Sequence, residues 1–183
     1  MRRLSVRGQD WSGIEPMNNS HSSEMNEHSA ALVTRETAPG AGSDQLEVNV
    51  IFTDEETTAA ALKCAESLAK GLGACIRLRA AIVVPFRLSL DQPPVSVPFM
   101  EQRLCKLVDQ WEREGPEPNV HLYVCRDRIE TMLFVLRPNS LVVIGDRKRW
   151  WPTAMSRMAG ILRAKGHRVV VVDVKGKTTG RLL

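Results

Sequence analysis

The chain has 183 residues, of which 43% are hydrophobic and 25% are charged, and its formal net charge is +4. This length suits one well-packed domain. No apolar run approaches the roughly 20 residues that a membrane span needs, and no apolar stretch follows the basic start of the chain. We therefore expect neither a membrane partner nor a secretory signal.

The first 44 residues differ in composition from the rest of the chain. They are rich in Ser, Asn, Glu and Gly, they lack sustained periodicity, and they hold four basic and six acidic side chains. Such a segment buries too little apolar surface to offset its chain entropy. We predict a disordered N-terminal extension over residues 1–44, with a brief helical turn at residues 30–33.

Apolar periodicity predicts five strands in the remaining chain. They are residues 46–52, 74–84, 120–125, 141–144 and 169–174. Four helices are predicted between these strands, from apolar residues at helical spacing and from glycine or proline stops. They are residues 57–70, 99–114, 129–136 and 153–165.

The regular alternation of strands and helices indicates the fold class. Continuous apolar runs in the last two strands are typical of parallel strands that are buried on both faces. With right-handed crossovers, the sequence predicts a doubly wound α/β domain over residues 45–175, whose mainly parallel five-stranded sheet carries helices on both faces. Residues 176–183 are predicted to form a flexible C-terminal tail.

The cysteines and histidines do not indicate metal chemistry. Cys64, Cys75, Cys105 and Cys125 form no C-x-x-C pair, and no two histidines have a metal-ligand spacing. We interpret the cysteines as reduced core thiols of a cytoplasmic protein, and we predict no metal site. No nucleophile lies in a pattern that supplies it with a base, so we predict no catalytic residue and favour a protein that is not an enzyme.

Three short motifs carry a resemblance to a known family. Asp54 follows the first strand, residues 141–145 read Leu-Val-Val-Ile-Gly, and a Gly-His-Arg link at 166–168 leads into Val-Val-Val-Val-Asp. With these motifs and this element order, the predicted domain resembles a universal stress protein, within the broader adenine-nucleotide α-hydrolase-like group. The resemblance implies the same Rossmann-like fold and a role in the stress response.

Family members that bind ATP share a phosphate loop, G-x2-G-x9-G-[ST], after the fourth parallel strand. Its glycines let backbone amides approach phosphate, and a helix N-terminus then faces the anion. In this sequence Gly145 matches the first glycine, but Lys148 stands at the second. The resemblance therefore implies a nucleotide-binding loop that is degenerate.

The end of this loop can be aligned in two ways. Counted forward from the first glycine, the final Gly-[ST] pair falls on Met158 and Ala159. Counted back from the last strand, it falls on Met155 and Ser156. In both alignments a side chain replaces the third glycine, which obstructs close contact between the backbone and a phosphate.

Ligands of such sheets bind at the carboxyl ends of the strands. The candidate residues for a nucleotide or another anion are Asp54, Val84, Gly145, Arg147, Lys148 and Ser156. Two interpretations remain open. The favoured one is a solvated basic loop with Asp54 as a helix N-cap. In the other, arginine and lysine side chains replace the backbone amides around an anion, with ATP as the cofactor that the resemblance suggests.

Two further segments indicate protein partners. Val169 begins a run of four valines in a strand that ends at Val174. In the family this strand lies at the sheet edge and pairs with its copy, and an exposed edge of this kind otherwise promotes aggregation. We therefore expect a homodimer through strand 169–174. Trp150 and Trp151 suggest a protein contact, whereas nucleic acid is not expected.

Two functions follow from these patterns. The favoured one is a regulatory or protective stress-response module that acts through homodimerisation and through binding of a ligand. The alternative is an ATP-binding universal stress protein with an atypical basic phosphate loop and slow ATP hydrolysis. An enzyme with a glycine-rich loop after the first strand ranks last, because residues 53–57 are acidic and hold no glycine.

Overall fold

The computed structural model describes most of the predicted domain and two short strands outside it. The described residues are 46–111, 115, 117–147 and 153–174, together with the backbone of 31–35 and 178–179. Within them, no helix is long and apolar enough to cross a membrane.

Every predicted strand and helix of the domain is confirmed, with ends that move by a few residues. The five central strands are β2 (Glu47–Ile51), β3 (Cys75–Val83), β4 (Asn119–Cys125), β5 (Leu141–Asp146) and β6 (Arg168–Asp173). The helices are α1 (Glu55–Leu72), α2 (Val97–Gln110), α3 (Arg128–Val135) and α4 (Ala154–Ala164).

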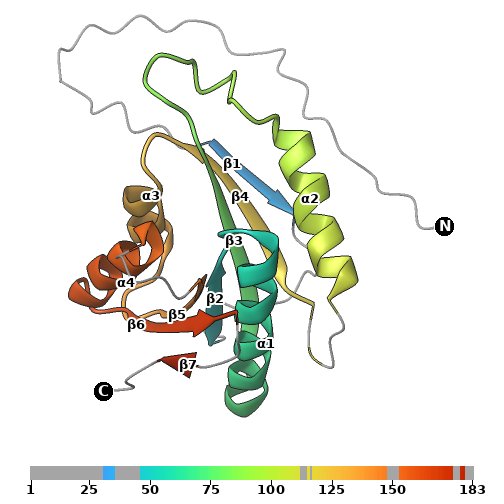
Figure 1. The fold of residues 1–183 in the computed structure, drawn as a ribbon, viewed down its shortest axis with the longest axis vertical. Helices are drawn as coiled ribbons and strands as arrows, with labels where there is room; N and C mark the ends of the chain where they lie inside the picture. The colour runs from blue at the N-terminus through green and yellow to red at the C-terminus, as the bar shows by residue number, and fades with distance from the viewer. Residues whose placement is uncertain are drawn as a thin grey trace, which may run out of the picture.

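The five central strands are all parallel to one another and lie in the order β4-β3-β2-β5-β6. Helices α1 and α2 lie on one face of the sheet, and α3 and α4 lie on the other (Figure 1). The prediction of a doubly wound α/β domain is therefore confirmed.

Two hydrophobic clusters, one on each face, hold the layers together. Val48, Val50 and Phe52 alternate along β2 and its end, and they pack with residues of α1 and α2. Ile51 points to the opposite face, where Met158 of α4 is fully buried with it. This alternation is the period of two that a strand imposes on its side chains.

The structure differs from the prediction at two short segments near the chain ends, and the other residues of 1–44 and 176–183 lie outside the described residues. Ala31–Arg35 forms β1, which pairs antiparallel with β4, so neither disorder nor a helical turn describes these residues. Thr178–Thr179 forms β7, which pairs antiparallel with Val171 and Val172 of β6. Strand β6 is therefore not the outermost strand, and the predicted flexible tail includes a strand.

Candidate functional site

The strand order changes direction between β2 and β5. Strands β3 and β4 lie on one side of β2, and the later strands β5 and β6 lie on its other side. Ligands of doubly wound sheets bind at the carboxyl ends of the two strands that flank this switch point. Here the Thr53 hydroxyl, after β2, donates a hydrogen bond to the Gly145 carbonyl of β5 at 3.3 Å.

Asp54 is the N-cap of α1. Its carboxylate accepts a hydrogen bond from the Thr57 amide at 3.0 Å, and the Thr57 hydroxyl accepts one from the Asp54 amide at 3.4 Å. This reciprocal capping box satisfies two amides of the first helical turn. Glu55 and Glu56 add two more carboxylates to that turn, where the helix dipole favours negative charge.

The pKa of the Asp54 carboxyl lies below its usual value. Burial alone would raise this pKa, but hydrogen bonds from the Thr57 amide and hydroxyl and the nearby Arg147 guanidinium outweigh that effect. Because the pKa is lower in the folded protein, the cap contributes stability above the pKa of the unfolded chain. That contribution is lost as the pH falls through the lower, folded pKa.

Gly145 lies against the backbone of α1. A Cβ atom at this position would lie 2.0 Å from the Thr57 carbonyl oxygen and 2.5 Å from its carbon. Backbone atoms of a helix cannot yield by that much, so β5 and α1 can approach this closely only with glycine at position 145. The packing of the domain thus accounts for Gly145 without a ligand.

Arg147 is engaged by the acidic start of α1. One of its terminal nitrogens lies 2.9 Å from a Glu56 carboxylate oxygen and 3.6 Å from an Asp54 oxygen. All three side chains are about half exposed, so these pairs are worth little as sources of stability. Their consequence is local, because they direct this guanidinium towards carboxylates.

A carboxylate also lies at the start of α4, where the phosphate loop of the family would meet a helix N-terminus. Thr153 is the N-cap, and its hydroxyl accepts a hydrogen bond from the Ser156 amide at 2.9 Å. The same hydroxyl donates to the Asp146 carboxylate at 2.5 Å. Asp146 therefore brings negative charge of the chain itself to the region that would attract a phosphate.

Val84 does not present its side chain to this site, because it is fully buried at the end of β3. Its carbonyl accepts a hydrogen bond from the Arg126 guanidinium at 3.2 Å. The same guanidinium donates to the carbonyls of Pro85 and Leu88 and lies over the Phe86 ring. Arg126 thus holds the loop that follows β3.

The described part of the switch point is acidic. Its carboxylates belong to Asp54, Glu55, Glu56 and Asp146, and its guanidiniums to Arg103 and Arg147. Arg103 donates to Glu55 at 2.6 Å and Arg147 to Glu56 at 2.9 Å, so each guanidinium already contacts a carboxylate. No group of three or more potential ligands among the described residues is placed to hold a metal ion.

The chain matches no protein-family model and no curated protein. Its structure is similar to that of a universal stress protein from Archaeoglobus fulgidus, with 16% sequence identity and a TM-score of 0.52. The similarity covers 69% of this chain and 92% of the other.

The fold is that of a universal stress protein. The resemblance that the sequence motifs carried is confirmed at this level. Within the universal stress protein fold, Asp54, Gly145 and Arg147 meet at the switch point, and Ser156 lies one hydrogen bond from Thr153. Lys148, Trp150 and Trp151 lie outside the described residues.

Sequence reasoning missed two residues of this site. Asp146 directly follows the glycine that matches the phosphate loop of the family, and its acidity at that position was the available signal against phosphate. Glu56 was visible only as part of an acidic helix start. Its contact with Arg147 joins residues 91 positions apart and depends on the tertiary structure.

Proposed function

We propose that this protein is a regulatory or protective stress-response module that is not an enzyme and does not use ATP at the switch point. The universal stress protein fold supports the stress-response role, and the observation that carries the statement on ATP is the hydrogen bond between Thr153 and Asp146 at the start of α4. A carboxylate of the chain there opposes the binding of phosphate.

Three further features support the proposal. Gly145 serves the packing of β5 against α1, so its presence is no argument for a phosphate loop. Arg147 is paired with Glu56 and Asp54, so an anion would have to compete with both carboxylates. Val84 is fully buried and offers no side-chain surface to a nucleotide base. These features support the proposal that the switch point does not bind ATP.

The melting temperature with millimolar ATP and magnesium tests this proposal. We expect ATP to give the natural chain no increase beyond that with the same concentration of inorganic phosphate, and the same result for Lys148→Gly, because the carboxylates remain in both. A ligand at about a hundred times its dissociation constant would add roughly 2.7 kcal/mol, or about 5–10 °C here. An increase with ATP but not with the same concentration of inorganic phosphate would contradict the proposal.

The module is proposed to act as a homodimer through the β6–β7 edge. Strand β7 pairs with only two residues of β6, and Arg163 of α4 donates to the Val169 carbonyl at 2.9 Å. These contacts cover part of the valine-rich edge, and a second copy would extend the sheet beyond them.

Sedimentation velocity tests the homodimer. We expect a dimer at micromolar concentrations of the full chain. Deletion of residues 176–183 identifies the contact strand, because a dimer that survives the deletion pairs through β6 and one that is lost pairs through β7. A full chain that stays monomeric at about 100 µM would contradict the proposed association.

A further inference from the structure

A row of polar side chains crosses the sheet at the end opposite the switch point. These side chains occupy alternating positions in β2, β3 and β4, so they share the face that carries α3 and α4. We call them the arginine cluster, and its members are Glu47, Asn49, Arg77, Arg79, His121 and Tyr123. The side chain of Glu47 is 9% exposed. Among the other members, all residues except Arg77 are less than a tenth exposed.

One carboxylate serves the guanidiniums of this cluster. A Glu47 oxygen lies 2.9 Å from Arg77 and 3.5 Å from Arg137, and its other oxygen lies 3.9 Å from Arg79. Arg77 and Arg79 are two residues apart on β3 and point to the same face. Two guanidiniums of the cluster therefore share a single negative charge.

Arg79 is the most buried of these cations, with its side chain 6% exposed. It donates to the Asn49 side-chain oxygen at 2.7 Å and to the Tyr123 hydroxyl at 2.5 Å. Both partners are neutral, and the Glu47 oxygen lies at the outer limit of an ion pair. Burial of a cation is costly unless an opposite charge lies close to it, so the cluster carries excess positive charge.

His121 adds no negative charge and little positive charge. Burial, with the nearby Arg79 and Arg77 guanidiniums, lowers its pKa to about 4, so the ring is neutral at pH 7. Its Nε2 atom lies 3.3 Å from an Arg77 terminal nitrogen. Because arginine can only donate, Nε2 is the acceptor and the other ring nitrogen carries the proton.

Arg77 links the buried cluster to the surface. Its side chain is 21% exposed, but its Nε atom is buried and has no hydrogen-bond partner. A buried donor without an acceptor is unfavourable. Because Nε is buried, an anion on the solvent side would contact the exposed part of the Arg77 side chain and would balance the excess charge there.

Further basic side chains surround the same end of the domain. Arg163 and Lys165 lie at the C-terminal end of α4, and Arg168 begins β6. All three residues are exposed. Since α4 runs antiparallel to the strands, its last turn lies beside their amino ends. This rim attracts anions towards the arginine cluster.

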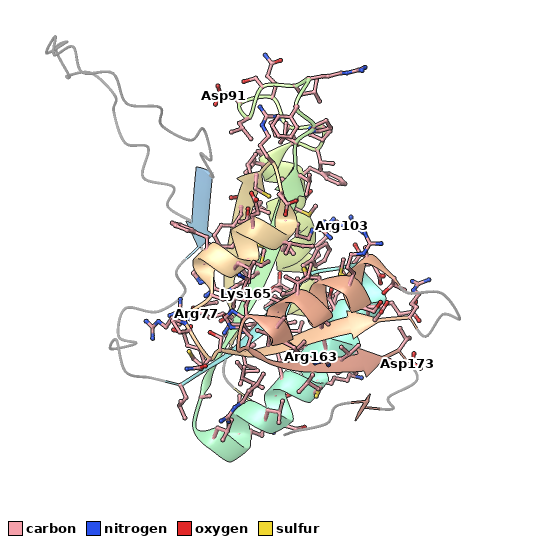
Figure 2. All side chains as sticks on the ribbon, turned by 90° about the vertical axis from the view of Figure 1, so that its left-hand side faces the viewer. Arg77, Asp91, Arg103, Arg163, Lys165 and Asp173 are labelled. Carbon is pink, nitrogen blue, oxygen red and sulfur yellow. The ribbon has the colours of Figure 1, made fainter. Side chains whose placement is uncertain are left out.

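We propose that the arginine cluster binds a small phosphate-type oxyanion, with Arg77 as its principal contact. Guanidiniums present paired donors that match the oxygens of such an anion. This site is separate from the switch point. Figure 2 shows Arg77 on one side of the domain, and Arg103, which pairs with the start of α1, on the other.

The experiment titrates inorganic phosphate against the melting temperature of the full chain, in a chloride buffer of constant ionic strength. We expect a saturable increase of about 3–6 °C. Arg77→Gln should lose the increase. Lys106→Gln removes the same charge from an exposed position on α2, on the other face of the sheet, and should keep it.

Two measurements make the outcome decisive. Phosphate is excluded from protein surfaces and stabilises proteins in general, so an equal, non-saturating increase in all three proteins would overturn the proposal. Line broadening in the phosphorus NMR spectrum of phosphate reports binding to the natural chain even if Arg77→Gln fails to fold. No broadening at millimolar phosphate would also overturn it. A phosphate monoester in parallel shows whether the site accepts the group on a larger molecule.

Discussion

Replacing Gly145 by Ala is expected to lower the free energy of unfolding by about 3 kcal/mol. The added methyl group would lie 2.0 Å from the Thr57 carbonyl oxygen, a backbone atom in the first turn of α1. To remove this overlap, α1 must move away from β5 at the point where Thr53 bonds to Gly145. Urea unfolding, followed by circular dichroism, measures the loss.

Gly160→Ala is the matched control for this substitution. Gly160 lies within α4, and a Cβ atom there would meet nothing within 4 Å. Because alanine favours helix more than glycine does, this variant should gain about 0.5–1 kcal/mol. A loss of less than about 1 kcal/mol in Gly145→Ala would show that α1 and β5 do not need glycine at their contact.

Replacing Arg79 by Met is expected to cost about 2–3 kcal/mol of unfolding free energy. The substitution leaves the Asn49 oxygen and the Tyr123 hydroxyl without their donor and removes one of the cations near the buried Glu47. Urea unfolding in phosphate-free buffer measures this cost without a contribution from a bound anion.

Arg147→Met is the control, because Arg147 also contacts two side chains but is 56% exposed. Solvent screens its ion pairs, so its loss should cost less than about 1 kcal/mol. Equal costs for the two variants would contradict the conclusion that the polar contacts of Arg79 are buried and strongly coupled to folding.

The sequence predicted those elements whose side chains repeat with a clear period. The continuous run of valines in β6 indicates a strand that is buried on both faces. The alternation of Val48 and Val50 in β2 indicates a strand with an apolar face. Strand β1 carried no such signal. It lies at a sheet edge beside β4, and its short sequence, Ala31–Arg35, pairs with residues about 90 positions away.

The site was less predictable than the fold because its contacts are tertiary. Gly145 matched a phosphate-loop glycine in the sequence, but the same residue is required where β5 meets Thr57, and one sequence cannot separate these reasons. In β3, Arg77 and Arg79 alternate with apolar residues, a pattern that places both arginines on one face of the strand. Their convergence on Glu47 needed the register of three strands.

The central claim is that contacts within the chain occupy the switch point, which does not hold a nucleotide. Isothermal titration calorimetry with ATP and magnesium tests this claim most directly. Titration of the natural chain and of Arg77→Gln separates the switch point from the arginine cluster. We predict no saturable heat in Arg77→Gln. Saturable heat that Arg77→Gln retains would contradict the account and identify a nucleotide site beside Asp54 and Asp146.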